Sequence, residues 1–172
     1  MSLRILGIDP GLRVTGYGVI EQSGNRARLI EGGVIAPKTS GTLEMRLRDL
    51  HAGISDVVAA TRPQWIVIEE LYSTYKNPLT AIMMGHARGV LCLAGAQHDV
   101  PVRTLGHSLV KRSLVGSGAA RKEQVNHMVT EMLGLRRRPE PNDVSDALAL
   151  ALAFLNLYEH EERLPSVLRR LA

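Results

Sequence analysis

The chain has 172 residues, of which 45% are hydrophobic and 22% are charged, and its formal net charge is +4. This length and composition fit one globular domain with a sizeable core. Cys92 is the only cysteine, which excludes a disulfide framework or a thiolate zinc site within one chain and indicates a reducing compartment. Asp9 interrupts the first apolar run too early for a signal peptide, and no run of apolar residues is long enough to span a membrane. We therefore expect a cytoplasmic protein.

The first part of the chain is predicted to form three strands, at residues 3–9, 14–21 and 27–35, joined by tight turns into an antiparallel meander. Apolar residues at helical spacing then predict a helix over 42–61. The run 65–69 is short, apolar and β-branched, which predicts a buried strand.

Asn77 and Pro78 are a good cap and first residue for a helix that we expect to continue to about residue 97. A last strand is expected at 100–104, and three shorter helices follow it, at 107–115, 121–134 and 144–158.

This order of elements predicts an α/β fold with a mixed sheet and helices on both of its faces. We expect one domain over residues 1–158, followed by a charged C-terminal tail over residues 159–172.

Four carboxylates stand where predicted core elements begin or end. Asp9 ends the first apolar run, Glu69 ends the fourth predicted strand, and Asp143 and Asp146 open the last apolar stretch. Acids are rarely buried unless they are paired or hold a metal, and oxygen ligands of this kind suit Mg²⁺ or Mn²⁺. If the three segments converge, they predict a metal-dependent phosphodiesterase, since two such ions promote in-line displacement at phosphorus.

Three of the four acids also have a simpler structural interpretation. Asp9 precedes Pro10-Gly11 and could only organise a turn. Asp143 and Asp146 are spaced to share one face of a helix, where acids at the first turn also stabilise the helix dipole. Because side chains alternate along a strand, Glu69 is the better site candidate and its neighbour Glu70 is expected to face solvent. The hypothesis depends on the occurrence of all four acids together.

Positive charge is concentrated in one segment. Between residues 103 and 138 the chain has eight Lys or Arg residues against two Glu residues. A basic segment beside an acidic metal site is what a nucleic-acid enzyme needs, because phosphates must be drawn toward carboxylates. A solvated basic surface is the alternative interpretation.

Several motifs in the chain are those of one known family. These motifs are Gly7-Ile8-Asp9-Pro10-Gly11, Val14-Thr15-Gly16-Tyr17-Gly18, Ile68-Glu69-Glu70, Gly85-His86-Ala87-Arg88-Gly89-Val90, Val110-Lys111, Lys122-Glu123-Gln124-Val125 and Asp143-Val144-Ser145-Asp146-Ala147-Leu148-Ala149. Over nearly its whole length the chain resembles the RuvC family of Holliday junction resolvases.

The resemblance implies a ribonuclease-H-like fold whose five-stranded mixed sheet has three antiparallel strands and then two parallel ones. It implies a homodimer that resolves four-way DNA junctions by symmetric paired nicks in recombination and repair, leaving 5′-phosphate and 3′-hydroxyl ends. Mg²⁺ or Mn²⁺, two ions per active site, would be the cofactor, and a branch-migration motor complex would be a partner.

The resemblance also implies roles for individual residues. The catalytic, metal-binding acids of the family fall on Asp9, Glu69, Asp143 and Asp146. Its DNA-contacting lysines fall on Lys111 and Lys122, and its base-stacking aromatic residue, for which Phe is also found, falls on Tyr72. The basic segment adds Arg112 and Arg121 as candidates for DNA binding.

Two other functions compete with this interpretation. The opening strand and turn also resemble those of actin-like or sugar-kinase ATPases, although the chain lacks the length for their second lobe. A catalytically silent junction-binding module would need only the basic segment, but four acids without a metal would weaken DNA binding.

The helix expected over 78–97 is predicted to form the dimer interface. Gly85 and Gly89 lie on one face of it and allow another backbone to approach. The domain's own sheet is the alternative partner for one face, but the helix is apolar around more of its circumference than one packing surface would use. Acidic substitutions at Met84 or Leu91 are expected to yield monomers.

Overall fold

The structure is a computed structural model that describes residues 2–24, 26–38, 40–71 and 78–163. It contains a five-stranded sheet with the strand order β3-β2-β1-β4-β5. The strands are β1 (Leu3–Asp9), β2 (Thr15–Ser23), β3 (Arg26–Ile35), β4 (Trp65–Glu69) and β5 (Val102–Leu105). β1, β2 and β3 pair antiparallel, whereas β4 runs parallel to β1 and β5 runs parallel to β4. The predicted mixed sheet is confirmed.

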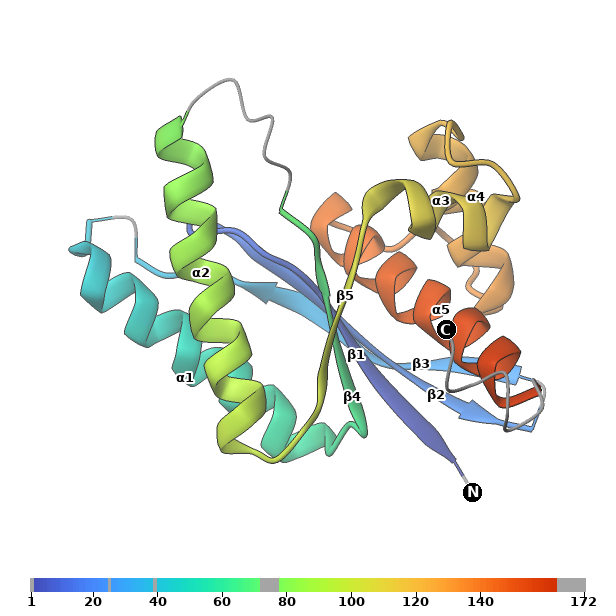
Figure 1. Cartoon of the computed structure of the whole chain (residues 1–172), viewed down its shortest axis with the longest axis horizontal. Coiled ribbons are helices and arrows are strands. Elements are labelled where there is room, and N and C mark those ends of the chain that lie inside the picture. The colour runs from blue at the N-terminus through green and yellow to red at the C-terminus, as the bar shows by residue number, and fades with distance from the viewer. Residues whose placement is uncertain (1, 25, 39, 72–77, 164–172) are drawn as a thin grey trace.

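Helices cover both faces of this sheet, as predicted (Figure 1). One face carries α1 (Leu43–Thr61) and α2 (Pro78–Gln97). The other carries α3 (His107–Val115), α4 (Lys122–Met132) and α5 (Asn142–Arg163). α5 lies directly across β1 and β2 and is the helix that brings the C-terminal acids to the sheet.

α5 continues past residue 158, where the sequence predicted its end and the start of a charged tail. Aromatic packing explains the longer helix. The ring of Tyr158 lies 6.3 Å from that of Trp65 on β4 and 5.9 Å from that of Phe154 one turn earlier. These contacts hold the end of the helix to the sheet, so its charged last turn forms although its residues are polar.

The alternation of side chains along the strands builds two cores. Ile5 on β1 and Val67 on β4 face α5, whereas Leu6 and Ile68 face α1 and α2. Both sets are almost completely buried. Because this alternation continues to the ends of the strands, it decides which face of the sheet the strand-end acids meet.

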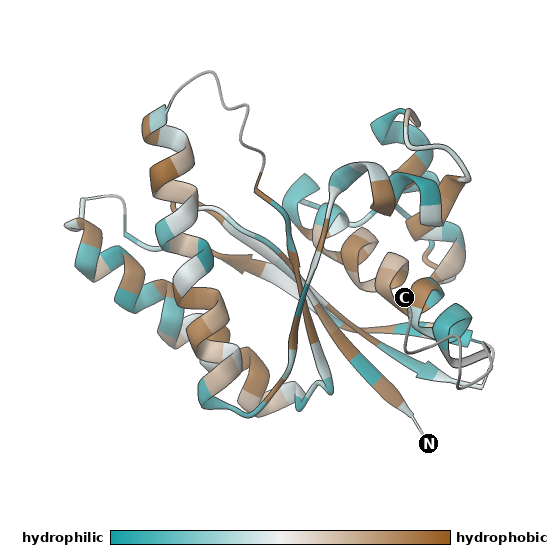
Figure 2. Cartoon of the chain, viewed as in Figure 1, coloured by the Kyte–Doolittle hydropathy of each residue, from teal (hydrophilic) through white to brown (hydrophobic). Residues whose placement is uncertain are grey.

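α2 is the exception to the expectation about membranes. Among the described helices, it is the one that is long and apolar enough to cross a bilayer, by length and composition alone, with a mean hydropathy of 1.3. Figure 2 shows apolar colouring along much of α2, whereas α1 beside it alternates with polar residues. Only 22% of the apolar window is buried within the chain. α2 therefore carries an apolar surface that its own domain does not cover.

Candidate active site

The two strand-end acids face the same side of the sheet. Asp9 is four positions after Ile5, and Glu69 is two positions after Val67. Because side chains alternate along a strand, both carboxylates face the α5 side, as Ile5 and Val67 do. β1 and β4 are parallel neighbours, with Ile8 opposite Ile68, so the two acids follow at the same end of the sheet. Glu70 has the opposite orientation and is exposed, as predicted.

Two glycines allow the start of α5 to lie directly on this part of the sheet. A Cβ atom at Gly7 would lie 2.0 Å from the carbonyl oxygen of Ala147, and one at Gly16 would lie 2.2 Å from that of Asp143. Any side chain would therefore push the helix away. Both glycines belong to motifs of the sequence, but their packing role was not predicted, because the contact joins segments far apart in the chain.

Three of the four predicted acids meet at one small cleft. The cleft encloses about 40 Å³ of open space and is lined by Asp9, Glu69 and Asp146 together with Lys111 and Lys122. This space accommodates ions and water molecules and is far below the several hundred Å³ that a bound nucleotide occupies. Asp143 lies on the same helix turn as Asp146 but lines the adjacent cavity beside Gly11.

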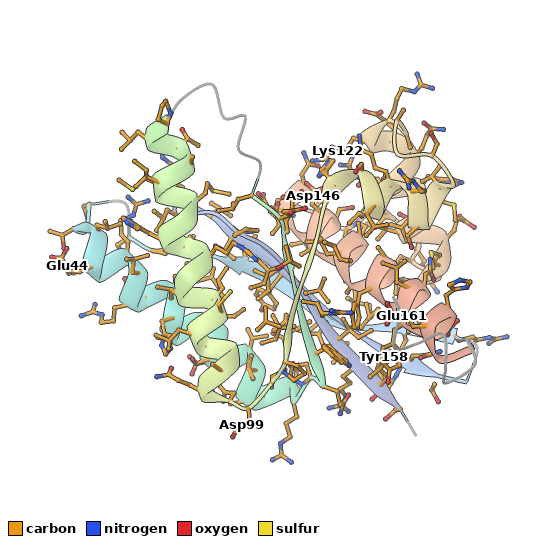
Figure 3. The ribbon with its side chains drawn as sticks, in the orientation of Figure 1. Glu44, Asp99, Lys122, Asp146, Tyr158 and Glu161 are labelled. Atoms are coloured by element: carbon orange, nitrogen blue, oxygen red, sulfur yellow. The ribbon has the colours of Figure 1, made fainter. Side chains whose placement is uncertain are left out.

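Two basic side chains contact the acids of the cleft. The Lys122 ammonium lies 2.6 Å from Oδ2 of Asp146, and Figure 3 shows the two residues together, from α4 and from the start of α5. Nδ1 of His107 lies 2.5 Å from Oε1 of Glu69. His107 lies in the basic segment of the sequence and was not among the predicted site residues. Its position directly after β5, beside the end of β4, is what brings it to Glu69.

The acids act electrostatically on one another. Burial is the largest effect on Asp9, and together with the carboxylates of Glu69, Asp146 and Asp143 it raises the pKa of Asp9 from 3.8 to about 7. The Lys122 ammonium acts in the opposite direction and lowers the pKa of Asp9. All four predicted acids thus share one electrostatic environment, although they line two adjacent cavities.

The donor set fits a hard divalent cation. Among the described residues, no three acidic, histidine or cysteine side chains lie close enough together to hold an ion. Lys122 and His107 contact two of the carboxylates. The site nevertheless offers oxygen donors, and its negative charge is concentrated around a carboxyl group that is hard to ionise. A divalent cation would relieve this repulsion, and oxygen donors are those that Mg²⁺ and Mn²⁺ prefer.

The remaining predicted residues lie around the cleft or outside the described part of the chain. Lys111, on α3, lines the cleft and is partly buried. Arg112 is exposed on the same helix, and Arg121 is exposed at the start of α4. Tyr72 lies outside the described residues.

The chain matches known proteins along most of its length. The family model for crossover junction endodeoxyribonuclease RuvC matches residues 5–154. The chain belongs to the RuvC family. A curated RuvC from Rhodopirellula baltica is 49% identical over 148 residues, which cover 86% of this chain and 83% of the relative.

Solved structures agree with this assignment. The RuvC structure of Thermus thermophilus has a TM-score of 0.85 at 35% identity, covering 92% of this chain and 96% of that one. T. thermophilus RuvC in complex with a Holliday junction substrate also has a TM-score of 0.85, at 31% identity over the same shares of the two chains. The yeast mitochondrial Holliday junction resolvase Ydc2 shares the fold, with a TM-score of 0.67 at 14% identity, covering 99% of this chain and 85% of its own.

RuvC membership confirms the predicted ribonuclease-H-like fold and identifies the chain as an endonuclease acting on Holliday junctions. It decides against both competing interpretations, the ATPase fragment and the catalytically silent module. RuvC proteins are divalent-metal-dependent nucleases, which agrees with the donor set of the cleft.

Proposed function

We propose that this endonuclease cuts four-way junctions at the cleft formed by Asp9, Glu69 and Asp146, with one nick in each of two opposed strands. The observation that carries the proposal is the convergence of these acids from β1, β4 and α5 beside two lysines. Carboxylates alone would repel a phosphodiester, and the lysines offset that repulsion at the place where the strand must lie.

The acids would hold Mg²⁺ or Mn²⁺, two ions per site, with Asp143 contributing from the adjacent cavity. When bound, these ions activate water and stabilise the leaving oxygen, which yields 5′-phosphate and 3′-hydroxyl ends. The chain's own contribution is to bring the donors together, although burial and the neighbouring carboxylates favour the protonated form of Asp9. Because the pKa of Asp9 is about 7, Asp9 must lose its proton before its carboxylate is available as a ligand near neutral pH.

Lys122 and Lys111 would hold the phosphates at the cut. The Lys122 ammonium pairs with Asp146, and both side chains are partly exposed. An arriving phosphate can therefore take over the ammonium, which frees the Asp146 carboxylate for a cation in the same step. Arg112 and Arg121 would contact phosphates further along the strand, and Tyr72 would stack on a base.

The outward face of α2 would form a two-fold dimer. Ile82 and Leu93 on this helix are 54% and 51% exposed. A Cβ atom at Gly85 or Gly89 would meet no atom of the described residues within 4 Å, apart from the helix's own backbone, so the sheet does not use their small size. Leu91, which the sequence analysis placed in the interface, is fully buried against the sheet, so substituting it would test the core and not the interface.

Three further proposals complete this function. Residues 1–158 would form the nuclease domain, with residues 159–172 as a tail whose first turn continues α5. The protein would work in the cytoplasm, with no membrane, despite the apolar composition of α2. A branch-migration motor complex would be its partner in the cell.

The decisive experiment is cleavage of a synthetic mobile four-way junction with Mg²⁺ or Mn²⁺, mapped at single-nucleotide resolution. Asp9→Asn, Glu69→Gln and Asp146→Asn should each slow nicking about a thousandfold, because the chemistry that bound ions supply contributes several kcal/mol. Asp143→Asn should have the smallest effect of the four acids, because its side chain lies in the adjacent cavity.

Junction affinity, measured with Ca²⁺ to prevent cutting, should be unchanged or tighter in these variants, because they remove negative charge from a phosphate site. Lys111→Ala and Lys122→Ala should reduce nicking more than affinity, and linear duplex is the control substrate. A parallel loss of binding and nicking in the acid variants would refute the assignment of the cleft as the active site.

A further inference from the structure

A buried polar pair lies directly behind the cleft. The Ser145 hydroxyl donates a 2.7 Å hydrogen bond to Oδ1 of Asn126. Ser145 is fully buried and Asn126 is 3% exposed, so the bond is shielded from water. It joins α5 to α4. Neither residue lines the cleft, but each is close in sequence to one that does.

The pair is placed to control the contact between Lys122 and Asp146. Ser145 immediately precedes Asp146 on α5, and Asn126 stands one helical turn after Lys122 on α4. Residues four apart lie on the same helix face, so Asn126 and Lys122 both project toward the start of α5. The buried bond and the 2.6 Å contact from the Lys122 ammonium to Asp146 are therefore two points of attachment between the same helix turns.

Lys122 needs such an anchor because it is the first residue of its helix. Helix ends fray, and a long lysine side chain on a frayed turn would sample many positions. The cap at this end, in which the Arg121 backbone N–H donates to Oε1 of Gln124, holds the turn to itself but not to α5. Asn126 is the buried polar residue of α4 whose hydrogen bond to Ser145 links the first turns of this helix to the start of α5.

The pair is not the most stabilising choice for this contact. The Nδ2 group of Asn126 is buried without a hydrogen-bond partner among the described residues. Such a donor destabilises the folded state, whereas two apolar side chains of similar shape would leave nothing unsatisfied. The neighbouring Val125 and Val129 pack α4 in that apolar way. A directional bond fixes the rotation and register of two helices more strictly than apolar packing does.

We propose that Asn126 and Ser145 are positioning residues, whose hydrogen bond sets the register of α4 on α5 and thereby holds the Lys122 ammonium where Asp146 and the cut phosphate meet. This inference rests on the proposed function of Lys122 and Asp146. According to this inference, a residue pair outside the cleft determines the relative position of Lys122 and Asp146 inside it.

The test compares stability with the chemical step. Ser145→Ala and the double variant Asn126→Leu/Ser145→Ala are assayed for single-turnover nicking of a synthetic junction with Mg²⁺, for junction affinity with Ca²⁺, and for Tm. We expect nicking to slow about tenfold in both variants, because small misplacements of a positioning group cost rate directly. We expect affinity to stay within about twofold, since one phosphate contact contributes little to total binding. The double variant, which leaves no buried donor unpaired, should keep the wild-type Tm or exceed it.

Two controls separate positioning from general stabilisation. Thr61→Val removes another buried hydroxyl, which donates a 2.7 Å hydrogen bond to the carbonyl oxygen of Val57 on the opposite face of the sheet. This variant should change Tm without changing nicking. In a Lys122→Ala background, Ser145→Ala should slow nicking by less than about twofold further, because the group that it positions is gone.

The proposal is wrong if the double variant nicks at the wild-type rate, or if Ser145→Ala slows nicking equally with and without Lys122. It is also wrong if every loss of nicking follows a loss of Tm. Wild-type protein and Asp146→Asn are assayed beside these variants. If wild type fails to nick, or if Asp146→Asn nicks normally, the proposed function fails instead.

Discussion

The two longest helices, α2 and α5, lie on opposite faces of the sheet, and both are apolar, but the chain uses them differently. From Val144 to Leu155, the residues of α5 are buried almost without interruption. On α2 only four of the described residues are buried, and all but one of them are small, namely Ala87, Leu91, Ala94 and Gly95. Composition alone does not separate a core helix from one that presents an apolar surface.

The glycines near each helix make the difference explicit. Gly7 and Gly16 lie on the sheet beneath α5, where a Cβ would collide with the helix backbone. Gly85 and Gly89 lie on α2 itself, where a Cβ would meet no other part of the described chain within 4 Å. The first pair is used within the chain and lets α5, which carries Asp143 and Asp146, lie close to the sheet. The second pair is available to a second copy, which would bring a second site to the other strand of a symmetric junction.

The largest expected effect is on the α5 side. Gly7→Ala should lower the free energy of unfolding by about 3 kcal/mol, because the nearest atoms are helix backbone and cannot rotate away. It should also slow nicking, since α5 carries Asp146. Denaturant unfolding and junction cleavage measure the two effects.

Gly32→Ala is the matched control for this change. Gly32 lies on β3 of the same sheet, and its Cβ would meet a methyl group of Val144 at 3.0 Å. A side chain can adjust by a few tenths of an ångström, so this variant should be clearly milder. Equal destabilisation by the two variants would contradict the account of α5 packing.

On the α2 side, Ile82→Glu should weaken dimerisation about a hundredfold while leaving the folded monomer intact. Ile82 is already 54% exposed within one chain, so the charge affects the monomer little but would be desolvated in an interface. Sedimentation gives the dimer constant, and paired nicking should fall with it. Val34→Glu, at a side chain 40% exposed on β3, is the control that should leave dimerisation unchanged.

Asp9→Asn should stabilise the metal-free protein above neutral pH, by about 2 kcal/mol. The pKa of Asp9 is raised from 3.8 to about 7, so between these values the folded state binds a proton that the unfolded state does not. Wild-type stability therefore falls as pH rises from about 4 to about 7, and the penalty is complete above pH 7. The full shift in the pKa of Asp9 corresponds to about 4 kcal/mol of stability. Solvent in the open cleft screens part of this effect, so the expected difference is about 2 kcal/mol.

Unfolding curves in EDTA at pH 4 and pH 8 test this prediction. The two proteins should be equally stable at the lower pH and diverge at the higher one. Saturating Mg²⁺ should close the gap at pH 8 by stabilising wild type, because the ion neutralises the repulsion. A gap that is the same at both pH values would show that Asp9 is not strained by its neighbours.

The sequence predicted the mixed sheet with helices on both faces and the face toward which the strand-end acids point, because both follow from local rules, whereas the convergence of the acids was a condition of the hypothesis. Alternation along a strand sends Asp9 and Glu69 to one face, and helical spacing puts Asp143 and Asp146 on one turn. These rules do not give the angle or height at which a helix lies on a sheet. The separation of Asp143 into the adjacent cavity was therefore not predicted.

Contacts between distant segments were missed for the same reason. His107 meets Glu69, and Asn126 meets Ser145, only after the helices have docked. Leu91 was assigned to the dimer interface although it faces the sheet, because an all-round apolar helix gives no periodic signal for its inner face. Such features depend on tertiary packing and not on spacing along the chain.

The smallest expected effect decides what the glycines of α2 are for. Gly85→Ala should stabilise the isolated monomer by about 1 kcal/mol, because glycine inside a helix is less favourable than alanine by that amount and a Cβ here meets nothing within 4 Å. In the dimer the same methyl group would lie between closely approaching helices and should weaken association. Measured in the Ile82→Glu background, where the dimer is already lost, the substitution should raise stability; measured in wild type at micromolar concentration, it should lower the dimer constant. If Gly85→Ala stabilises both forms equally, the close approach of two α2 helices at Gly85 is wrong, and the dimer must use another part of the surface.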